Sequence, residues 1–330
     1  MTLGFVTTAV MNLLIPFIKG AVPMCIVWGI NGLAQSLMWP PMLKIMKTAM
    51  NEDDFNKGCV QTNLGSTIAT IFIYLLSPAV ISVWSWKAVF FITALCGVIM
   101  AITWFTVLTK IERSADIKYV LKKDSVKKKS KHTPAMPIVL LIFTLAAIFF
   151  QGILRDGVTT WLPTYIYESF GLSSEKSILT SAVIPIFSYI SLQICSKFYS
   201  KTGKNPFKCG LIIFTVGAAA ALLLVIFGRH SVILTAVMCA LIVGCMHGVN
   251  LVLISFIPGI YGNNENVSEL SGTLNFMTYV GSAASAYGFA LLSDSFGWNG
   301  TIVSWDMIAL LGTAAVGVCK IIDKEPKNEQ

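Results

Sequence analysis

Arg155 is a charged residue within an apolar stretch of the sequence, so it needs a partner or water to stabilise its charge. It lies in the apolar stretch 149–165, FFQGILRDGVTTWLPTY, and is the only Lys or Arg that falls deep inside an apolar run. A guanidinium stays protonated in proteins, and at mid-bilayer it costs about 2.5–3.5 kcal/mol on insertion scales. Its planar donors match the oxygens of phosphate and carboxylate groups. Arg155 is therefore a candidate anion-binding residue that faces either a structural partner or a water-filled path.

Membrane-spanning helices must hold this charge. The 330 residues are 55% hydrophobic and only 12% charged, with a mean hydropathy of +0.74, whereas soluble domains carry about 25% charged residues. The net charge of +8 does not indicate nucleic-acid binding, because the basic residues lie in short segments between apolar runs. The composition predicts an all-α, polytopic membrane protein with the lipid bilayer as a partner.

The apolar runs set the expected number of spans, since each needs about 20 mainly apolar residues. An even number of spans would place both termini on the same side. By this criterion the sequence predicts ten transmembrane helices, at residues 2–18, 21–46, 59–80, 87–109, 136–165, 177–199, 208–228, 231–258, 271–293 and 298–322.

Basic residues are unevenly distributed between the two sides of these predicted spans, and cytoplasmic loops carry the excess. The sparse side has Lys19, Lys87, Lys176 and Arg229. We therefore expect a multi-pass protein of the cell membrane with both termini and the long loop in the cytoplasm. The rich side has Lys44, Lys47, Lys57, the basic residues between Lys110 and Lys131, Lys197, Lys201, Lys204, Lys208, Lys320, Lys324 and Lys327.

The basic segment divides the predicted spans unequally. Residues 1–109 hold four spans, residues 110–135 form a basic cytoplasmic loop, residues 136–322 hold six spans, and residues 323–330 form a cytoplasmic tail. Many secondary transporters have two six-span halves, so we expect the first two helices of such a plan to be missing. The loop fits a solvated linker that sets orientation, or a segment that binds anionic lipid headgroups.

The second predicted span contains a polar pair in the stretch WGINGLAQSLMWPP. Asn31 and Gln35 are four residues apart and share one helix face. Small residues nearby allow close helix approach. The pair therefore fits either hydrogen bonding between helices or a face that lines a pore.

These motifs resemble the organophosphate:phosphate antiporters of the major facilitator superfamily. The second-span stretch is similar to their fourth helix, and LRDGVTTWLPTY resembles their seventh. The turn SDSFGWNGTI resembles the family's turn before its last helix. The resemblance implies a major-facilitator-type helical bundle, in which the arginine is one of two that clamp the substrate phosphate. The matching seventh-helix positions are Arg155, Gly157, Trp161, Pro163, Thr164 and Tyr165.

Other site positions follow from the resemblance. Asn63 belongs to the family's fifth-helix N-x-G pattern, and Thr62 stands where the phosphate transporter has a histidine. His247 and Tyr279 fall where family tyrosines face the cavity. Gly152 departs from the family, which often has an aromatic residue there. The full set of expected substrate-binding residues is Arg155, His247, Tyr279, Thr62, Asn63, Asn31, Gln35 and Trp161.

Structural roles compete with these assignments. Arg155 can instead form a structural ion pair, although we expect Asp156 to be a poor partner because consecutive helix residues point about 100° apart. Asp306 is a more distant candidate partner. A lone histidine such as His247 is often hydrogen-bonded packing. Ser200 replaces an expected aspartate in a loop motif, which weakens the match.

The preferred function is a secondary transporter that exchanges an organic phosphate, of the glycerol-3-phosphate or sugar-phosphate type, for inorganic phosphate. Alternatives are an organic-anion symporter, a sugar-phosphate sensor and an inactive truncated fragment. No G-x-x-x-x-G-K-[ST] phosphate loop occurs. We expect no enzyme activity, cofactor or metal, small anionic substrates, and a monomer that binds no nucleic acid.

Overall fold

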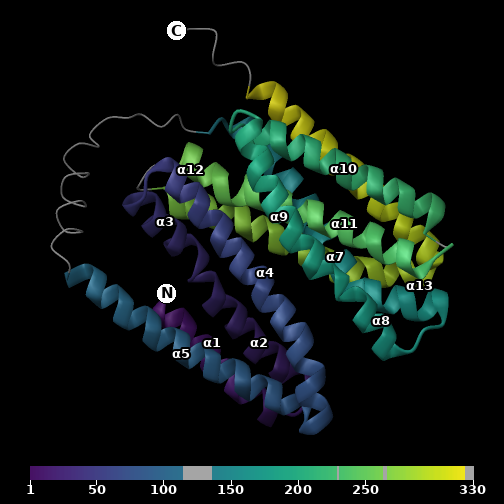
Figure 1. The fold of residues 1–330 in the computed structure, drawn as a ribbon, viewed down its shortest axis with the longest axis horizontal. Helices are drawn as coiled ribbons and strands as arrows, with labels where there is room; N and C mark the ends of the chain where they lie inside the picture. Colours follow the sequence, from purple (N-terminus) through teal and green to yellow (C-terminus); the bar gives the residue numbers. More distant parts are fainter. Residues whose placement is uncertain (114–135, 229, 263–265, 324–330) are drawn as a thin grey trace. The chain divides into compact units, whose positions relative to one another are not determined.

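The computed structural model describes residues 1–113, 136–228, 230–262 and 266–323, and every regular element in these ranges is a helix (Figure 1). The expected all-α class is therefore confirmed. The chain divides into two compact units. The first contains Met1–Phe55, Phe72–Pro134 and Gly262–Gly272, and the second contains Asn56–Ile71, Ala135–Tyr261 and Thr273–Gln330.

The first unit is built on α1 (Thr2–Leu14), which packs against α2 (Ala21–Ser36) and α5 (Trp86–Arg113). Small residues bring these helices close. A Cβ on Gly4 would lie 2.7 Å from the Ala34 carbonyl oxygen, and a Cβ on Gly97 would lie 3.1 Å from the Ala9 Cβ. Small residues at contacts are typical of helices that pack within membranes.

The predicted span 21–46 is made of two helices, because α2 ends at Ser36 and α3 (Trp39–Ala49) begins with prolines in its first turn. A proline lacks the N–H that would continue a helix from the preceding turn. The short 3-10 helix η1 (Ile15–Phe17) closes the segment that begins with α1.

The long helix α4 (Glu52–Val83) has a clear start signal. Asn51 caps it, since the side-chain oxygen accepts a 2.9 Å hydrogen bond from the Asp54 N–H. Acidic residues fill the first turn, where their negative charges interact favourably with the positive end of the helix dipole. Its residues 56–71 group with the second unit.

The central helix of the second unit is α11 (Val232–Val249). It packs against α7 (Ile138–Phe170), α9 (Val183–Lys201) and α10 (Pro206–Phe227). The span that contains α11 is the most buried of the apolar spans in the described residues. A helix with apolar residues on every side is expected at such a central place.

Shorter elements complete this unit. α8 (Ser174–Ser181) follows α7, and the π-helix η2 (Asn250–Phe256) and α12 (Ile257–Tyr261) continue α11. α13 (Val267–Ile322) runs from the first unit into the second, and its later part lies beside α10 (Figure 1). A Cβ on Gly312 would lie 2.3 Å from the Phe214 ring, which shows how closely α10 and α13 pack.

The sequence analysis expected ten spans, and this count is higher than the number of long apolar helices in the described residues. Eight helices in the described residues are long and apolar enough to cross a membrane, and Thr2–Phe17 is shorter than these. α13 joins the predicted spans 271–293 and 298–322 across Gly297, whose φ of 65° and ψ of −177° break the helix. Two helical segments therefore meet at Gly297, and they correspond to the two predicted spans.

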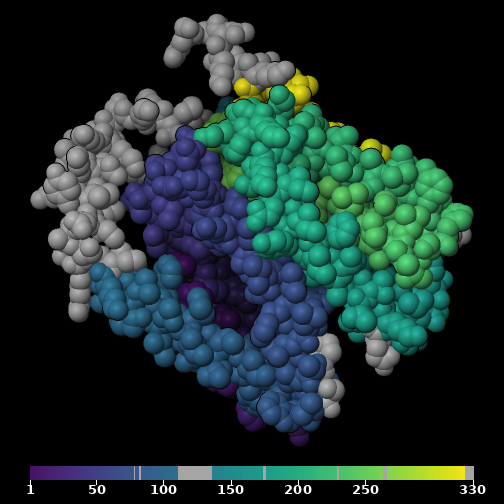
Figure 2. Space-filling view, in the orientation of Figure 1, coloured from purple at the N-terminus to yellow at the C-terminus, as the bar shows by residue number. Residues whose placement is uncertain are grey.

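The predicted boundaries between the four-span half, the basic loop, the six-span half and the tail stay a prediction. Residues 114–135 and 324–330, which hold most of the loop and the tail, lie outside the described residues. Many of the exposed side chains of the described spans are large and apolar. Figure 2 shows α5 on the outside of the first unit, and its exposed side chains include Leu95, Ile102 and Phe105.

Candidate functional site

Arg155 forms an ion pair with the residue next to it in the chain. Its Nε donates a 2.7 Å hydrogen bond to Oδ1 of Asp156, and its Nη2 donates a 2.8 Å hydrogen bond to Oδ2. The expectation that Asp156 is a poor partner is wrong. The guanidinium ends a long, flexible side chain that can fold back across the turn, and its fork matches both carboxylate oxygens.

The expected distant partner of Arg155 was also wrong. Asp306 lies in the later part of α13, and its Oδ1 is buried without a hydrogen-bond partner among the described residues. The ion pair of Arg155 is local, with side chains that are 15% exposed for Arg155 and 30% exposed for Asp156.

Side chains from two other helices surround this pair. Ser282 of α13 lies near the Asp156 carboxylate. His247 of α11 lies close enough to both members of the pair for an electrostatic interaction, and Tyr279 of α13 interacts electrostatically with Arg155. Arg155, Asp156, His247, Tyr279 and Ser282 are therefore neighbours in the structure, and a substrate site formed by the predicted residues among them stays a prediction.

Glycines bring α7 and α13 together at this point. A Cβ on Gly152 would lie 2.2 Å from the carbonyl oxygen of Thr278, and a Cβ on Gly281 would lie 2.3 Å from the carbonyl oxygen of Phe149. Each helix thus presents a glycine to the backbone of the other. The family's aromatic residue at position 152 would not fit this crossing, which explains the departure.

The same crossing continues one turn further along α7. A Cβ on Gly157 would lie 2.3 Å from the ring of Phe289 and 2.8 Å from the Cβ of Ser285. Asp156 sits between the two glycine contacts in the sequence of α7. The glycines thus determine how near the ion pair lies to Ser282.

Gln151 is a site-adjacent residue that the sequence analysis did not single out. It is fully buried, and its Nε2 donates a 3.1 Å hydrogen bond to the carbonyl oxygen of Met246, next to His247. Its Oε1 has no hydrogen-bond partner among the described residues. The sequence could have indicated Gln151 as a neighbour of the site, because a glutamine four residues before Arg155 shares its helix face.

Thr62 and Asn63 are half-buried and make internal hydrogen bonds. The Thr62 hydroxyl donates to the Gly58 carbonyl, and Asn63 Nδ2 donates to the Cys59 carbonyl at 2.9 Å and to Ser255 Oγ at 3.2 Å. Ser255 lies in η2, where the wider π-helical turn changes the usual bonding ladder. Asn63 therefore links α4 to this irregular segment.

Asn31 and Gln35 belong to the first unit, and the structure gives them different surroundings. Asn31 is buried, and its Oδ1 has no hydrogen-bond partner among the described residues, whereas Gln35 is exposed. The buried amide fits the packing role left open by the sequence. Their place in a substrate site stays a prediction.

Trp161 belongs to an aromatic cluster at the carboxyl-terminal end of α7. Its ring lies 6.4 Å from that of Trp298, which lies 5.2 Å from the ring of Tyr165. The Trp298 Nε1 donates a 2.7 Å hydrogen bond to Oε2 of Glu168. Trp161 is six residues beyond Arg155, or roughly 9 Å along the helix, and the structure does not bring the two together.

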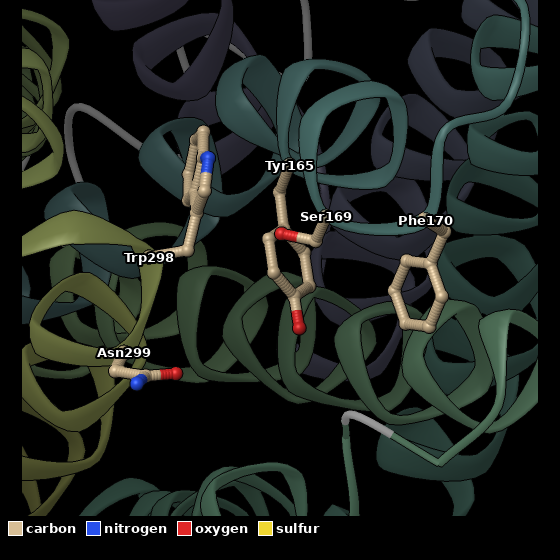
Figure 3. A pocket seen from close by; sticks show the side chains of 5 residues that line it. All are labelled: Tyr165, Ser169, Phe170, Trp298 and Asn299. Carbon is tan, nitrogen blue, oxygen red and sulfur yellow. The ribbon is translucent and has the colours of Figure 1, made fainter.

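A cavity of about 440 Å³ opens beside this cluster, and Figure 3 shows Tyr165 between Trp298 and Phe170. Tyr165 is ten residues past Arg155, roughly 15 Å along α7, so the cavity is separate from the ion pair. Its lining residues are Tyr165, Ser169, Phe170, Trp298 and Asn299.

The helices and the charge pair inside a span define the class of protein: a polytopic α-helical membrane protein with a partly buried ion pair at mid-span. The sequence pattern of the Major Facilitator Superfamily matches residues 1–286. The chain therefore belongs to the Major Facilitator Superfamily. Proteins of this family are transporters and are not enzymes.

Three known proteins illustrate the similarity. A probable hexose phosphate transport protein of Chlamydia trachomatis is 19% identical over 359 residues, which cover 100% of this chain and 76% of that protein. The glycerol-3-phosphate transporter of Bacillus subtilis is 22% identical, covering 91% of this chain and 72% of that protein. The structure of the E. coli fucose:proton symporter matches with a TM-score of 0.64 and 14% identity, covering 97% of this chain and 83% of that chain.

Proposed function

We propose that the chain is a secondary active transporter of an organic phosphate, of the glycerol-3-phosphate or sugar-phosphate type, which it exchanges for inorganic phosphate by alternating access. The observation that carries this proposal is the bidentate bonding of Arg155 to two carboxylate oxygens within a membrane span. The carboxylate of Asp156 occupies the fork as a phosphate would. The two relatives named for the transport of hexose phosphate and glycerol-3-phosphate support the same substrate class.

The surrounding groups suit an anion of this kind. In the proposed site, Arg155 supplies charge and planar donors, while His247 and Tyr279 supply neutral donors from α11 and α13. Fixed donors inside a span replace the water that a phosphate loses on entry. Thr62, Asn63, Asn31, Gln35 and Trp161 are proposed as further contacts on the substrate path.

The proposal includes a membrane setting. The chain would lie in the cell membrane as a monomer, with both termini on the cytoplasmic side, where the basic residues gather. A substrate site at mid-membrane suits alternating access.

An exchange assay tests the proposal directly. The purified protein is placed in liposomes filled with inorganic phosphate, and uptake of labelled phosphate is followed against unlabelled competitors outside. Glycerol-3-phosphate and glucose-6-phosphate should compete, and both should drive labelled phosphate out of loaded liposomes. Failure of every phosphate compound to exchange would refute the proposal.

A second candidate is symport of an organic carboxylate. The observation that favours it is the carboxylate of Asp156, which the Arg155 fork holds with two hydrogen bonds. In the same liposomes, competition by a sugar carboxylate such as glucuronate, with none by glucose-6-phosphate, would favour this alternative.

A further inference from the structure

The bonds of Arg155 leave one edge of its guanidinium available. The group has five N–H donors, and the Asp156 carboxylate accepts from Nε and from Nη2. The Nη1 donors and the second N–H of Nη2 have no hydrogen-bond partner among the described residues. An incoming anion can therefore meet two parallel donors without first displacing the aspartate.

Docking on that edge creates an electrostatic conflict. The single positive charge of Arg155 would then face the carboxylate of Asp156 and the new anion together. When two anionic groups share a site of low dielectric, one of them is strongly driven to take up a proton. The side chain of Asp156 is 30% exposed, so the surrounding helices do not enclose it fully.

Few groups near Asp156 can respond to this conflict. Arg155 stays protonated, and Ser282 does not titrate. The π-helix η2, which also packs against α7, has no ionisable side chain, and Lys176 of α8 is exposed beyond the far end of α7. His247 of α11 and Tyr279 of α13 are the remaining titratable neighbours of the pair.

We infer that Asp156 is a proton-binding counter-anion, which takes up one proton when a substrate anion docks on the Nη1 edge of Arg155 and releases it when the anion leaves. The proton comes from water, forms one O–H bond on the carboxylate, and returns to water with the anion on the other side. No other bond changes. This inference rests on the anion site proposed above, and names the coupling ion of that site.

The coupling has a definite consequence for transport. Because each bound anion is accompanied by a proton, exchange of one anion for another moves protons equally in both directions. Net uptake of an anion instead follows a pH gradient, with the acidic side as donor. Linkage requires that the proton raises the affinity for the anion by the same factor as the anion raises the affinity for the proton.

A structural role for Asp156 is the competing explanation, since its carboxylate pairs with the Arg155 guanidinium. The variant Asp156→Asn separates the two. Asparagine keeps the size and the hydrogen bonding of a protonated aspartate but carries no titrating group. Asp294→Asn, which changes an exposed carboxylate of α13 far along the helix from Ser282, is the matched control.

The first test compares two liposome assays with labelled inorganic phosphate. We expect the ratio of uphill uptake, driven by an acidic exterior, to exchange at equal pH to fall strongly in Asp156→Asn and to stay at the wild-type value in Asp294→Asn. Affinity of Asp156→Asn for phosphate at alkaline pH should rise by about 5- to 150-fold, the usual range of coupling. Comparison of the variants cancels the protonation of phosphate itself.

The second test needs no variant, so it holds even if Asp156→Asn does not insert. Infrared difference spectroscopy of the wild-type protein should show a protonated carboxyl band when phosphate is added. Absence of that band overturns the inference. Uphill uptake that survives in Asp156→Asn, or that is lost only in His247→Asn, overturns it as well, because the proton would then lie elsewhere.

The two proposals fail in different ways. If the wild-type protein neither binds nor exchanges phosphate, the proposed function is wrong and the coupling inference falls with it. If the wild-type protein exchanges phosphate and Asp156→Asn shows the same pH-driven uptake, the proposed function stands and only the inference is overturned.

Discussion

A charged side chain inside a membrane span needs a partner, and Arg155 finds it in the adjacent residue. The two hydrogen bonds to Asp156 lower the free-energy cost of placing a guanidinium in an apolar region, because a buried charge is tolerated when it is paired and hydrogen-bonded. The same fork is an anion-binding group. One side chain can therefore have both the structural and the ligand role that the sequence analysis treated as alternatives.

Replacing the guanidinium by an ammonium tests this fork. We expect Arg155→Lys to insert normally but to lose phosphate exchange by at least about tenfold, because a point charge cannot form the paired, planar bonds of arginine. Initial rates of labelled phosphate exchange in liposomes measure the effect.

The control for that variant is Lys176→Arg, which makes the reverse change at an exposed position of α8. It should exchange phosphate at the wild-type rate. Wild-type exchange by Arg155→Lys would exclude Arg155 from the substrate site and leave it a structural residue.

At the scale of elements, the crossing of α7 and α13 holds the ion pair beside Ser282. Glycines on both helices let the backbones approach, and a side chain at either position meets a carbonyl oxygen. Such close approach allows dispersion and polar contacts where lipid supplies no hydrophobic force between helices.

We expect Gly152→Ala to lower the stability of the second unit by about 1–3 kcal/mol, the usual penalty of overpacking. The added Cβ would lie 2.2 Å from the Thr278 carbonyl oxygen, so one helix must move. Thermal unfolding of the detergent-solubilised protein measures the change.

Gly288→Ala is the matched control, because it makes the same substitution in α13 where nothing lies within 4 Å of the new Cβ. It should be neutral, or stabilising by up to about 1 kcal/mol through helix propensity. Equal stability of the two variants would mean that the crossing tolerates a wider separation than the structure has.

The kink of α13 gives a second prediction at this scale. Gly297 has a φ of 65° and a ψ of −177°, a region that is essentially restricted to glycine. We expect Gly297→Ala to destabilise the protein by about 1–3 kcal/mol in the same unfolding assay. A loss no greater than that of Gly288→Ala would show that the backbone relaxes without strain.

At the scale of the molecule, the groups that surround Arg155 all belong to the second unit, although part of α4 and part of α13 lie in the first. Ligand binding should therefore stabilise this unit as a whole. A ligand at 100 times its Kd stabilises the folded state by about 2.7 kcal/mol.

We expect inorganic phosphate to raise the unfolding temperature of the wild-type protein beyond the rise that it causes in Arg155→Lys. The comparison is needed because phosphate stabilises many proteins through exclusion from their surface. Differential scanning fluorimetry over a range of phosphate concentrations measures the difference. Identical shifts in the two proteins would argue against phosphate binding at Arg155.

Much of this architecture was predictable from local sequence. Apolar run length and the scarcity of charge indicated a helical membrane protein, and the stretch around Arg155 indicated the family. These signals are local, because a helix satisfies its own backbone in lipid whatever its neighbours are. The predicted ten spans exceed the eight long apolar helices of the described residues, because Thr2–Phe17 is short and because α13 covers two predicted spans on either side of Gly297.

The pairing of side chains depended on the fold. Asp156 became the partner of Arg155 through a side-chain conformation, and His247 and Tyr279 came beside the pair through the packing of α11 and α13 on α7. Gly152, a puzzling departure in the sequence, proved to be required by the backbone of Thr278. Local hydropathy carries no information about such contacts, because they arise only when helices distant in the chain meet at specific residues.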